Sequence, residues 1–157
     1  MSKTPVVGKK APNFKRPATG DKILSLKDFK GQFLVLYFYP KDATPGCTTQ
    51  GQNFRNFYSS FQQLNCDILG VSRDSIKSHE RFKEKQSFPF DLLSDEDETM
   101  CQDYDVIKLK KMYGREYMGI ERSTFLIDDK GKLLQEWRKV KVKGHVEQVL
   151  AAVEAIN

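Results

Sequence analysis

Phe33-Leu-Val-Leu-Tyr-Phe-Tyr-Pro-Lys-Asp-Ala-Thr-Pro-Gly-Cys-Thr-Thr-Gln50 is the stretch that decides the fold. Its apolar run 33–39 predicts a buried strand that stops at Pro40. A short segment rich in turn residues follows, and Cys47 falls where a helix is expected to begin. Free N–H groups and the positive dipole end of a helix favour an anion, so they favour a thiolate. Cys47 is therefore the candidate nucleophile, and the hydroxyl of Thr44 can donate a hydrogen bond to the sulfur or to its substrate.

The spacing Pro40-x-x-x-Thr44-x-x-Cys47 resembles the peroxidatic-cysteine motif of the peroxiredoxins, and the surrounding residues are similar to the bacterioferritin comigratory protein, or peroxiredoxin Q, branch. The similarity continues in Leu92-Leu-Ser-Asp-Glu-Asp97 and in Gly119-Ile-Glu-Arg-Ser-Thr-Phe-Leu-Ile-Asp128. The resemblance implies an α/β, thioredoxin-like fold: a central mixed β-sheet flanked by helices, with a peroxiredoxin-type N-terminal extension. It also implies an antioxidant thiol peroxidase that reduces hydrogen peroxide and organic hydroperoxides.

Peroxide reduction makes specific demands on such a site. A thiolate that attacks the O–O bond becomes a sulfenic acid and expels hydroxide or alkoxide, so donors must stabilise the charge that develops on oxygen. Thr44 offers a hydroxyl, and the amides near Gly46 and Cys47 offer N–H groups. The resemblance implies that Arg122 supplies the cation and that Pro40 shields the sulfur from solvent.

Regeneration of the thiolate is where this sequence departs from the family pattern. Many members of the branch carry a resolving cysteine five positions after the peroxidatic one, where this chain has Gln52. Others place the resolving cysteine in the following helix, but the helix expected here at 76–86 contains no cysteine. Cys66 and Cys101 remain. We interpret both as inert buried thiols, with a resolving role as the alternative. The prediction is a one-cysteine cycle in which thioredoxin, glutaredoxin or a small thiol reduces the sulfenic acid.

Two other classes of function compete with the peroxidase. A thiol–disulfide oxidoreductase on the same fold normally needs a Cys-x-x-Cys pair, and the residue three positions after Cys47 is Gln50. A non-enzymatic redox sensor or binding protein would only record the oxidation of Cys47 for a partner to read. Turnover with a reductant separates the peroxidase from both.

Composition restricts the remaining possibilities. The chain has 157 residues and is 39% hydrophobic, so we expect one domain over residues 1–157. The net charge of +5 is concentrated at 108–115 and 138–143, which we interpret as a solvated basic face able to help dock an acidic redox partner, with no nucleic-acid motif beside it. A monomer is expected, with a dimer as the alternative.

The location and the cofactor content follow from what the sequence lacks. It contains no apolar run long enough for a membrane span, and its start, residues 1–5, lacks the apolar core of a signal peptide, so a cytoplasmic protein is expected. Three cysteines without Cys-x-x-Cys spacing argue against a disulfide framework or a zinc site. The two histidines, His79 and His145, have no ligand-type spacing, so no metal and no other cofactor is expected.

Strands and helices alternate along most of the chain, which predicts parallel crossover connections. Besides 33–39, strands are expected at 23–26, 66–72 and 90–93, and helices at 48–64, 76–86, 96–104 and 145–156. Ser75 and Ser94 are the expected N-caps of the second and third helices.

Two further stretches lie in the last third of the chain. Residues 106–117 show a weak pattern, so we expect a loop or insertion there. Strands at 123–127 and 132–137 flank Asp128-Asp-Lys-Gly131 and predict a β-hairpin in which Gly131 takes a left-handed conformation.

Overall fold

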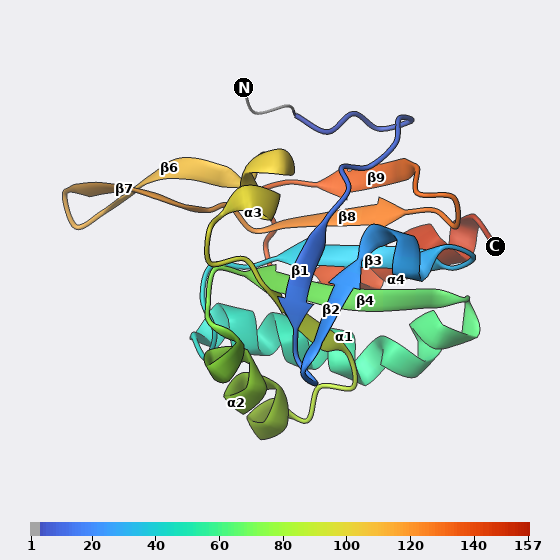
Figure 1. The fold of residues 1–157 in the computed structure, drawn as a ribbon, viewed down its shortest axis with the longest axis horizontal. Coiled ribbons are helices and arrows are strands. Elements are labelled where there is room, and N and C mark those ends of the chain that lie inside the picture. Colours follow the sequence, from blue (N-terminus) through green and yellow to red (C-terminus); the bar gives the residue numbers. More distant parts are fainter. Residues whose placement is uncertain (1–3) are drawn as a thin grey trace.

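A computed structural model describes residues 4–157, so residues 1–3 of the stretch interpreted as lacking a signal peptide lie outside it. The main sheet has seven strands: β1 (Lys15–Ala18), β2 (Lys22–Ser25), β3 (Phe33–Phe38), β4 (Cys66–Ser72), β5 (Asp91–Ser94), β8 (Ser123–Ile127) and β9 (Leu133–Trp137). The helices are η1 (Leu26–Phe29), α1 (Pro45–Gln63), α2 (Ile76–Gln86), α3 (Thr99–Asp103) and α4 (His145–Ala155). The strand order is β2-β1-β5-β4-β3-β8-β9 (Figure 1).

The centre of the sheet is parallel, as the alternation of strands and helices predicts. β3 pairs with β4 in parallel, with Phe33 opposite Cys66, and β4 pairs with β5 in the same way. The helices α1 and α2 make the two crossovers. β8 and β9 are antiparallel, and their predicted hairpin is confirmed, with Gly131 at a φ of 89°. The β1–β2 hairpin extends the other edge through β1 and β5.

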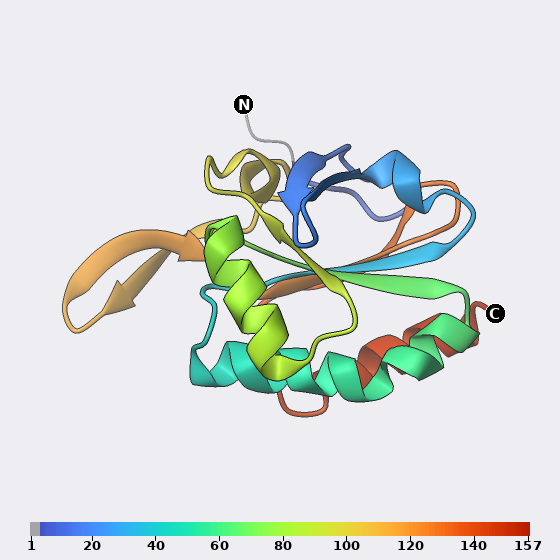
Figure 2. The ribbon, with the colours of Figure 1, turned by 60° about the horizontal axis from the view of Figure 1, so that its bottom comes forward.

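Apolar side chains cover both faces of this sheet. On one face, α1 and α4 lie side by side beneath the strands (Figure 2), and α2 adds Phe82. From α1, Phe54 and Phe61 are fully buried in this layer. The other face is covered by η1, α3 and the segment around Phe14. The end of β3 and the start of α1 are therefore fixed by packing on both sides of the sheet.

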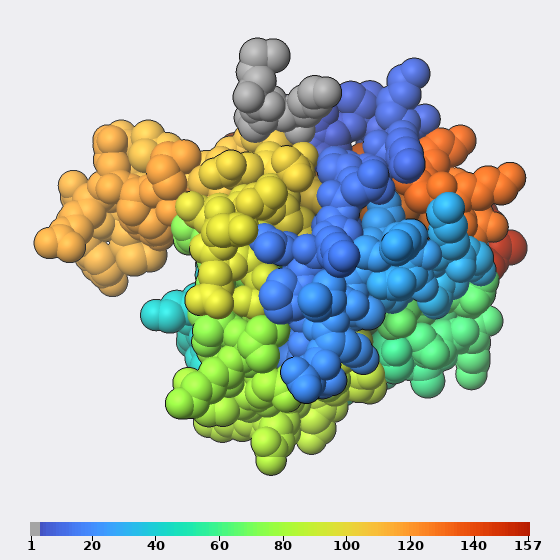
Figure 3. All heavy atoms as spheres, viewed as in Figure 1, coloured from blue at the N-terminus to red at the C-terminus, as the bar shows by residue number. Residues whose placement is uncertain are grey.

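The expectation of a loop at 106–117 is wrong. The structure has an antiparallel hairpin there, β6 (Ile107–Met112) and β7 (Arg115–Ile120), with Tyr113 at a φ of 53° and Gly114 at 75° in the turn. Two central residues with positive φ are the mark of a tight type I′ turn. β6 mixes lysines with apolar residues, and β7 is exposed over its first four residues, so neither strand has the buried face that makes a strand recognisable from sequence. The hairpin projects from the body of the protein (Figure 3).

The expected cap of the third helix is also wrong. α3 begins at Thr99 with Glu98 as its N-cap residue, and Ser94 is the last residue of β5. The Ser94 hydroxyl donates to the carbonyl of Asp74 at 2.6 Å, so it links the end of β5 to the loop after β4 instead of capping a helix. Ser75, in contrast, caps α2 as predicted, because its side chain accepts a hydrogen bond from the Ser78 amide.

Candidate active site

Cys47 lies in the first turn of α1, just beyond the carboxyl end of β3. The helix begins three residues earlier than the expected Thr48, because Pro45 occupies its first position, where the missing N–H costs nothing. The first backbone bond of the helix runs from the Thr48 amide to the Thr44 carbonyl at 2.9 Å. The amides of Gly46 and Cys47 come before that bond and belong to the free N–H groups of the helix start. The Cys47 side chain is 2% exposed.

Arg122 reaches Cys47 through the pairing of strands. β8 runs antiparallel to β3 with Ser123 opposite Phe38, so the residue before β8 lies at the end of β3. The Arg122 Nη2 atom is 3.5 Å from Cys47 Sγ, although 75 positions separate the two residues. A Cβ at Gly46 would lie 3.2 Å from the same Nη2, so glycine leaves room for this approach.

Thr44 and Pro40 lie on the loop between β3 and α1. Thr44 is the N-cap residue of α1, and its hydroxyl donates to the Lys41 carbonyl at 2.7 Å, which closes the loop on itself. In this geometry the hydroxyl proton points to the loop and not to the sulfur. Pro40 is half-buried one residue after Tyr39. Both predicted residues therefore belong to the segment that carries Cys47 into place.

Gln50 is a site residue that the sequence reasoning missed. It is fully buried, and its Oε1 accepts a hydrogen bond from Arg122 Nη1 at 2.6 Å. Gln50 lies three positions after Cys47 on a helix, so the two side chains share a face, and this spacing could have revealed it. Among the described residues, the Gln50 Nε2 and the Tyr37 hydroxyl are buried atoms without a hydrogen-bond partner. Burial raises the pKa of Tyr37 well above its ordinary value, and the nearby Cys47 raises it further.

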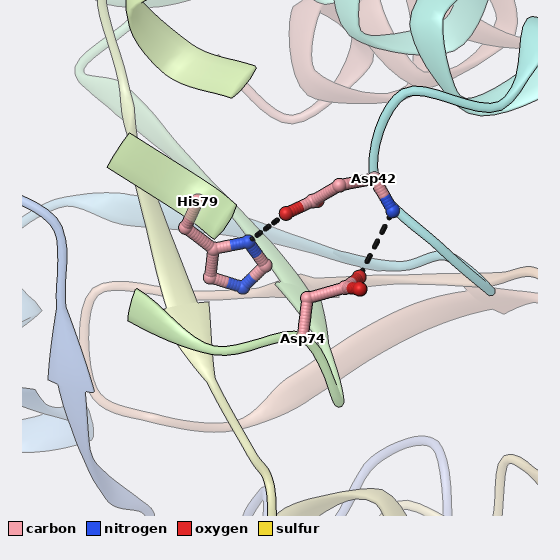
Figure 4. Close-up of side chains that lie close together, drawn as sticks. All are labelled: Asp42, Asp74 and His79. Carbon is pink, nitrogen blue, oxygen red and sulfur yellow. Dashed lines mark hydrogen bonds and ion pairs between the residues drawn. The ribbon is translucent and has the colours of Figure 1, made fainter. Parts of the chain in front are cut away.

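A hydrogen-bond network that includes Asp42, Asp74 and His79 holds the loop between β3 and α1 (Figure 4). Asp42 Oδ2 lies 2.7 Å from His79 Nδ1, and Asp42 Oδ1 accepts from the Tyr39 hydroxyl at 2.6 Å. The Asp42 amide donates to Asp74 Oδ2 at 2.9 Å. The network ties the loop to α2 and to the end of β4. No motif in the sequence indicated it, because its members come from separate elements.

Asp42, Asp74 and His79 also place three potential metal ligands within 4.8 Å of one another. Hydrogen bonds already account for these atoms, since His79 Nε2 lies 2.8 Å from the Leu93 carbonyl and Nδ1 faces Asp42. Both ring nitrogens of His79 face oxygen atoms. The cluster therefore acts as a structural tie, with no imidazole lone pair of His79 directed to open space.

Cys66 and Cys101 are buried free thiols far from Cys47. Cys66 is paired with Phe33 at the start of β3, whereas Cys47 follows the other end of that strand, at Phe38. Because a strand rises about 3.3 Å per residue, Cys66 lies about 16 Å from the Phe38 end of β3. Cys101 packs on the opposite face of the sheet from Cys47. Burial, with a contribution from Asp67, raises the pKa of Cys66 to about 12, and burial with Asp95 raises the pKa of Cys101 still more.

Comparison with known proteins agrees with this geometry. Residues 7–136 match the model of the AhpC/TSA family. The chain therefore belongs to this family of peroxiredoxins, which are thiol-dependent peroxidases on a thioredoxin-like fold. Within the family it falls in the branch of Bcp and peroxiredoxin Q: it is 51% identical to peroxiredoxin Bcp of Bacillus subtilis over 151 residues, 96% of each chain.

Solved structures place it in the same branch. The fold matches that of a cysteine variant of Xylella fastidiosa PrxQ with a TM-score of 0.92, at 45% identity and 98% coverage of both chains. It also matches the Xanthomonas campestris bacterioferritin comigratory protein, studied for its alkyl peroxide reduction activity, with a TM-score of 0.87, at 51% identity and 90% coverage of both chains. The predicted fold class and peroxidase function are confirmed, in preference to an oxidoreductase of the Cys-x-x-Cys type or a non-enzymatic sensor. In the described residues, no helix is both long and apolar enough to cross a membrane.

Proposed function

We propose that Cys47 is the peroxidatic cysteine. Its thiolate attacks one oxygen of the peroxide, an S–O bond forms as the O–O bond breaks, and the sulfur becomes a sulfenic acid. The displaced hydroxide or alkoxide takes up a proton and leaves as water or alcohol. The single observation that carries this assignment is the 3.5 Å approach of the Arg122 guanidinium to the sulfur at a helix N-terminus.

The other site residues serve the same step. Arg122 stabilises both the thiolate and the charge on the departing oxygen, and the Gly46 and Cys47 amides add N–H donors. Thr44 donates to the thiolate or to the peroxide once its hydroxyl turns from the Lys41 carbonyl, where it now lies at 2.7 Å. Pro40 excludes water from the sulfur. Its half-buried position beside the loop supports this role.

The cycle closes with an external thiol. The sulfenic acid condenses with a thiol of the reductant, which releases water and forms a mixed disulfide. A second thiol of the reductant then attacks the reductant's own sulfur in that disulfide, so Cys47 leaves as thiolate and the reductant leaves as a disulfide. A disulfide needs Cα atoms within about 7 Å, and the positions of Cys66 and Cys101 support neither as an internal resolver. This makes the protein a one-cysteine peroxiredoxin reduced by thioredoxin or glutaredoxin.

The setting of the cycle belongs to the same proposal. The substrates are hydrogen peroxide and organic hydroperoxides, in line with the alkyl peroxide reduction studied in the Xanthomonas campestris relative. A reducing compartment, the cytoplasm, suits a protein whose three cysteines are all free. The protein acts as a monomer.

Peroxide consumption by cysteine variants tests this proposal. Wild type, Cys47→Ser, Cys66→Ser and Cys101→Ser are compared with dithiothreitol, thioredoxin and glutaredoxin systems. We expect only Cys47→Ser to abolish turnover, and the fastest reductant identifies the partner. Loss of thioredoxin-driven turnover in Cys66→Ser or Cys101→Ser would overturn the one-cysteine cycle. Retained activity in Cys47→Ser would overturn the assignment of the nucleophile.

A further inference from the structure

The β6–β7 hairpin stands beside the active site and away from the body of the protein. β7 ends at Ile120, two positions before Arg122, so the base of the hairpin adjoins the guanidinium at Cys47. Figures 1 and 2 show the hairpin leaving the protein on the side where α1 begins. A two-stranded hairpin gains little stability on its own in water, yet this one exposes several large apolar side chains. These are Leu109, Met112, Tyr113, Tyr117 and Met118, each between 41% and 97% exposed.

The strand register divides these side chains between two faces, because residues directly opposite each other in an antiparallel pair point to the same side. Lys110 lies opposite Tyr117, and Met112 lies opposite Arg115. The Lys110 and Tyr117 side chains come together over Gly119, near the base of the hairpin. We name the surface of Lys110, Met112, Arg115 and Tyr117 the site face.

Lys110 is half-buried on an otherwise exposed stretch of strand, so the site face turns its base toward the body of the protein. Gly119, on the same face, is buried three positions before Arg122, so the base of the face adjoins the active-site arginine. Burial lowers the pKa of Lys110, and the Arg122 charge lowers it further. The other face, which we name the far face, carries Leu109 opposite Met118 and Lys111 opposite Glu116.

The two faces differ in charge. On the far face, Lys111 lies 3.6 Å from Glu116, so its charge is balanced. On the site face, neither Lys110 nor Arg115 forms an ion pair with a carboxylate in the part of the chain that the structure describes. The site face therefore combines two unbalanced cations with exposed aromatic and thioether surface, on a hairpin whose base adjoins Arg122.

We propose that the site face of the β6–β7 hairpin docks the protein thiol reductant that regenerates Cys47, a partner whose reactive cysteine lies in an apolar surface bordered by carboxylates. The inference rests on the proposed one-cysteine cycle, in which a second protein must bring its sulfur to Cys47. Carboxylates of such a partner neutralise Lys110 and Arg115 while its apolar surface covers Tyr117 and Met112. A second copy of this chain fits less well, because a two-fold contact through the site face would set the same cations against each other.

Two matched triple variants test the docking face. Met112→Ser/Arg115→Glu/Tyr117→Ser changes the site face, and Leu109→Ser/Lys111→Glu/Met118→Ser changes the far face. Each replaces two apolar side chains by serine and one cation by glutamate, so net charge and its long-range effect on association are the same. Turnover is measured with thioredoxin and glutaredoxin systems over a range of reductant concentrations at saturating peroxide, and separately with dithiothreitol.

We expect the site-face variant to lose about tenfold or more in kcat/KM for the protein reductant that wild type uses faster. The dithiothreitol-driven turnover of the site-face variant should stay within about twofold of wild type. The far-face variant should keep its kcat/KM for the protein reductant within the same range. Equal losses in both variants, no loss in the site-face variant, or a wild type that accepts neither protein reductant would overturn the docking proposal. A concentration-dependent dimer in sedimentation that only the site-face variant abolishes would assign the face to a second copy.

Two other outcomes concern the peroxidase cycle itself and the folding of the variants. Absence of dithiothreitol-driven turnover in wild type would contradict the proposed peroxidase cycle itself, which distinguishes it from failure of the docking surface. Should either triple variant lose its cooperative melting transition, the single variants Arg115→Glu and Lys111→Glu replace the pair under the same criteria, with a loss expected only for Arg115→Glu.

Discussion

Gln50 holds the guanidinium of Arg122 beside the sulfur of Cys47. One terminal nitrogen of Arg122 donates to Gln50 Oε1 at 2.6 Å, and the other lies 3.5 Å from Cys47 Sγ. Both Gln50 and Cys47 belong to α1, so the first turns of one helix supply the nucleophile and the group that orients its cation. The planar guanidinium presents both donors in one rigid geometry, which a lysine ammonium on its flexible stem does not.

Arg122→Lys should slow oxidation of Cys47 by hydrogen peroxide by about a hundredfold, because one donor to the developing oxyanion and the fixed geometry of the fork are lost. The measurement is the second-order rate of thiol loss in single turnover. Arg55→Lys is the matched control: Arg55 is also on α1 and donates to the Gln86 carbonyl at 2.8 Å, away from the sulfur. A rate for Arg122→Lys equal to that of Arg55→Lys would contradict the role of the guanidinium.

Gln50→Leu should lower the same rate by about fivefold while the fold persists, because Arg122 loses a hydrogen bond of about 1 kcal/mol that orients it. Gln52→Leu provides the control, since Gln52 lies on the same helix and bonds Gln86 at 2.9 Å instead of the arginine. The single-turnover rate of each variant is compared at pH 7. Equal rates for the two leucine variants would show that Gln50 does not orient Arg122.

Asp42→Asn should destabilise the protein by about 3 kcal/mol, because it leaves the buried His79 without its charged partner. The Asp42 and His79 side chains are 4% and 0% exposed. Urea unfolding measures the change, and Glu98→Gln, which breaks the more exposed ion pair with Arg73, should cost less than about 1 kcal/mol. The double variant Asp42→Asn/His79→Gln should cost less than the sum of the two single changes. Additive costs would mean that the two residues do not form a coupled pair.

The pH dependence of stability should carry the signature of His145. Burial, with a contribution from the Arg122 charge, lowers the pKa of His145 to about 4 from an ordinary value of 6.5. Between these values the unfolded chain binds the proton and the folded protein does not, so stability rises with pH from about 4 to about 6.5 and is then constant. The gain is at most about 3 kcal/mol. Urea unfolding of wild type and His145→Gln at pH 5 and pH 7 should show a smaller pH difference in the variant; equal differences would contradict the assignment.

Local sequence patterns predicted the elements that pack into the core. β3 is buried on both faces, and its sequence is the continuous apolar run expected at 33–39, which extends one residue beyond the strand. The bounds of the helix after Ser75 are confirmed as Ile76–Gln86. The hairpin at 107–120 buries little of either face, so its sequence carries no such apolar pattern, and it was missed.

The sequence predicts only those active-site features that lie within one continuous segment of the chain. Cys47 and its place at a helix start follow from the stretch around it, whereas the contact with Arg122 depends on the antiparallel pairing of Ser123 with Phe38. Nothing local to Arg122 encodes that pairing, and only the family resemblance selected this arginine. The bond between Asp42 and His79 likewise joins two elements whose separate sequences give no sign of it.

The two remaining thiols should be unreactive in the folded protein. A pKa of about 12 leaves about one Cys66 in ten thousand as thiolate at pH 8, and the pKa of Cys101 is raised by burial even more. Iodoacetamide at pH 8, followed by peptide mapping, should therefore leave both unmodified for at least a hundred times longer than in urea. After one equivalent of hydrogen peroxide, dimedone should label Cys47 alone, and the peptide map should contain no disulfide. A disulfide from Cys47 to Cys66 or Cys101 would require the sheet or α1 to open during the cycle, and it would replace the external thiol with an internal resolver.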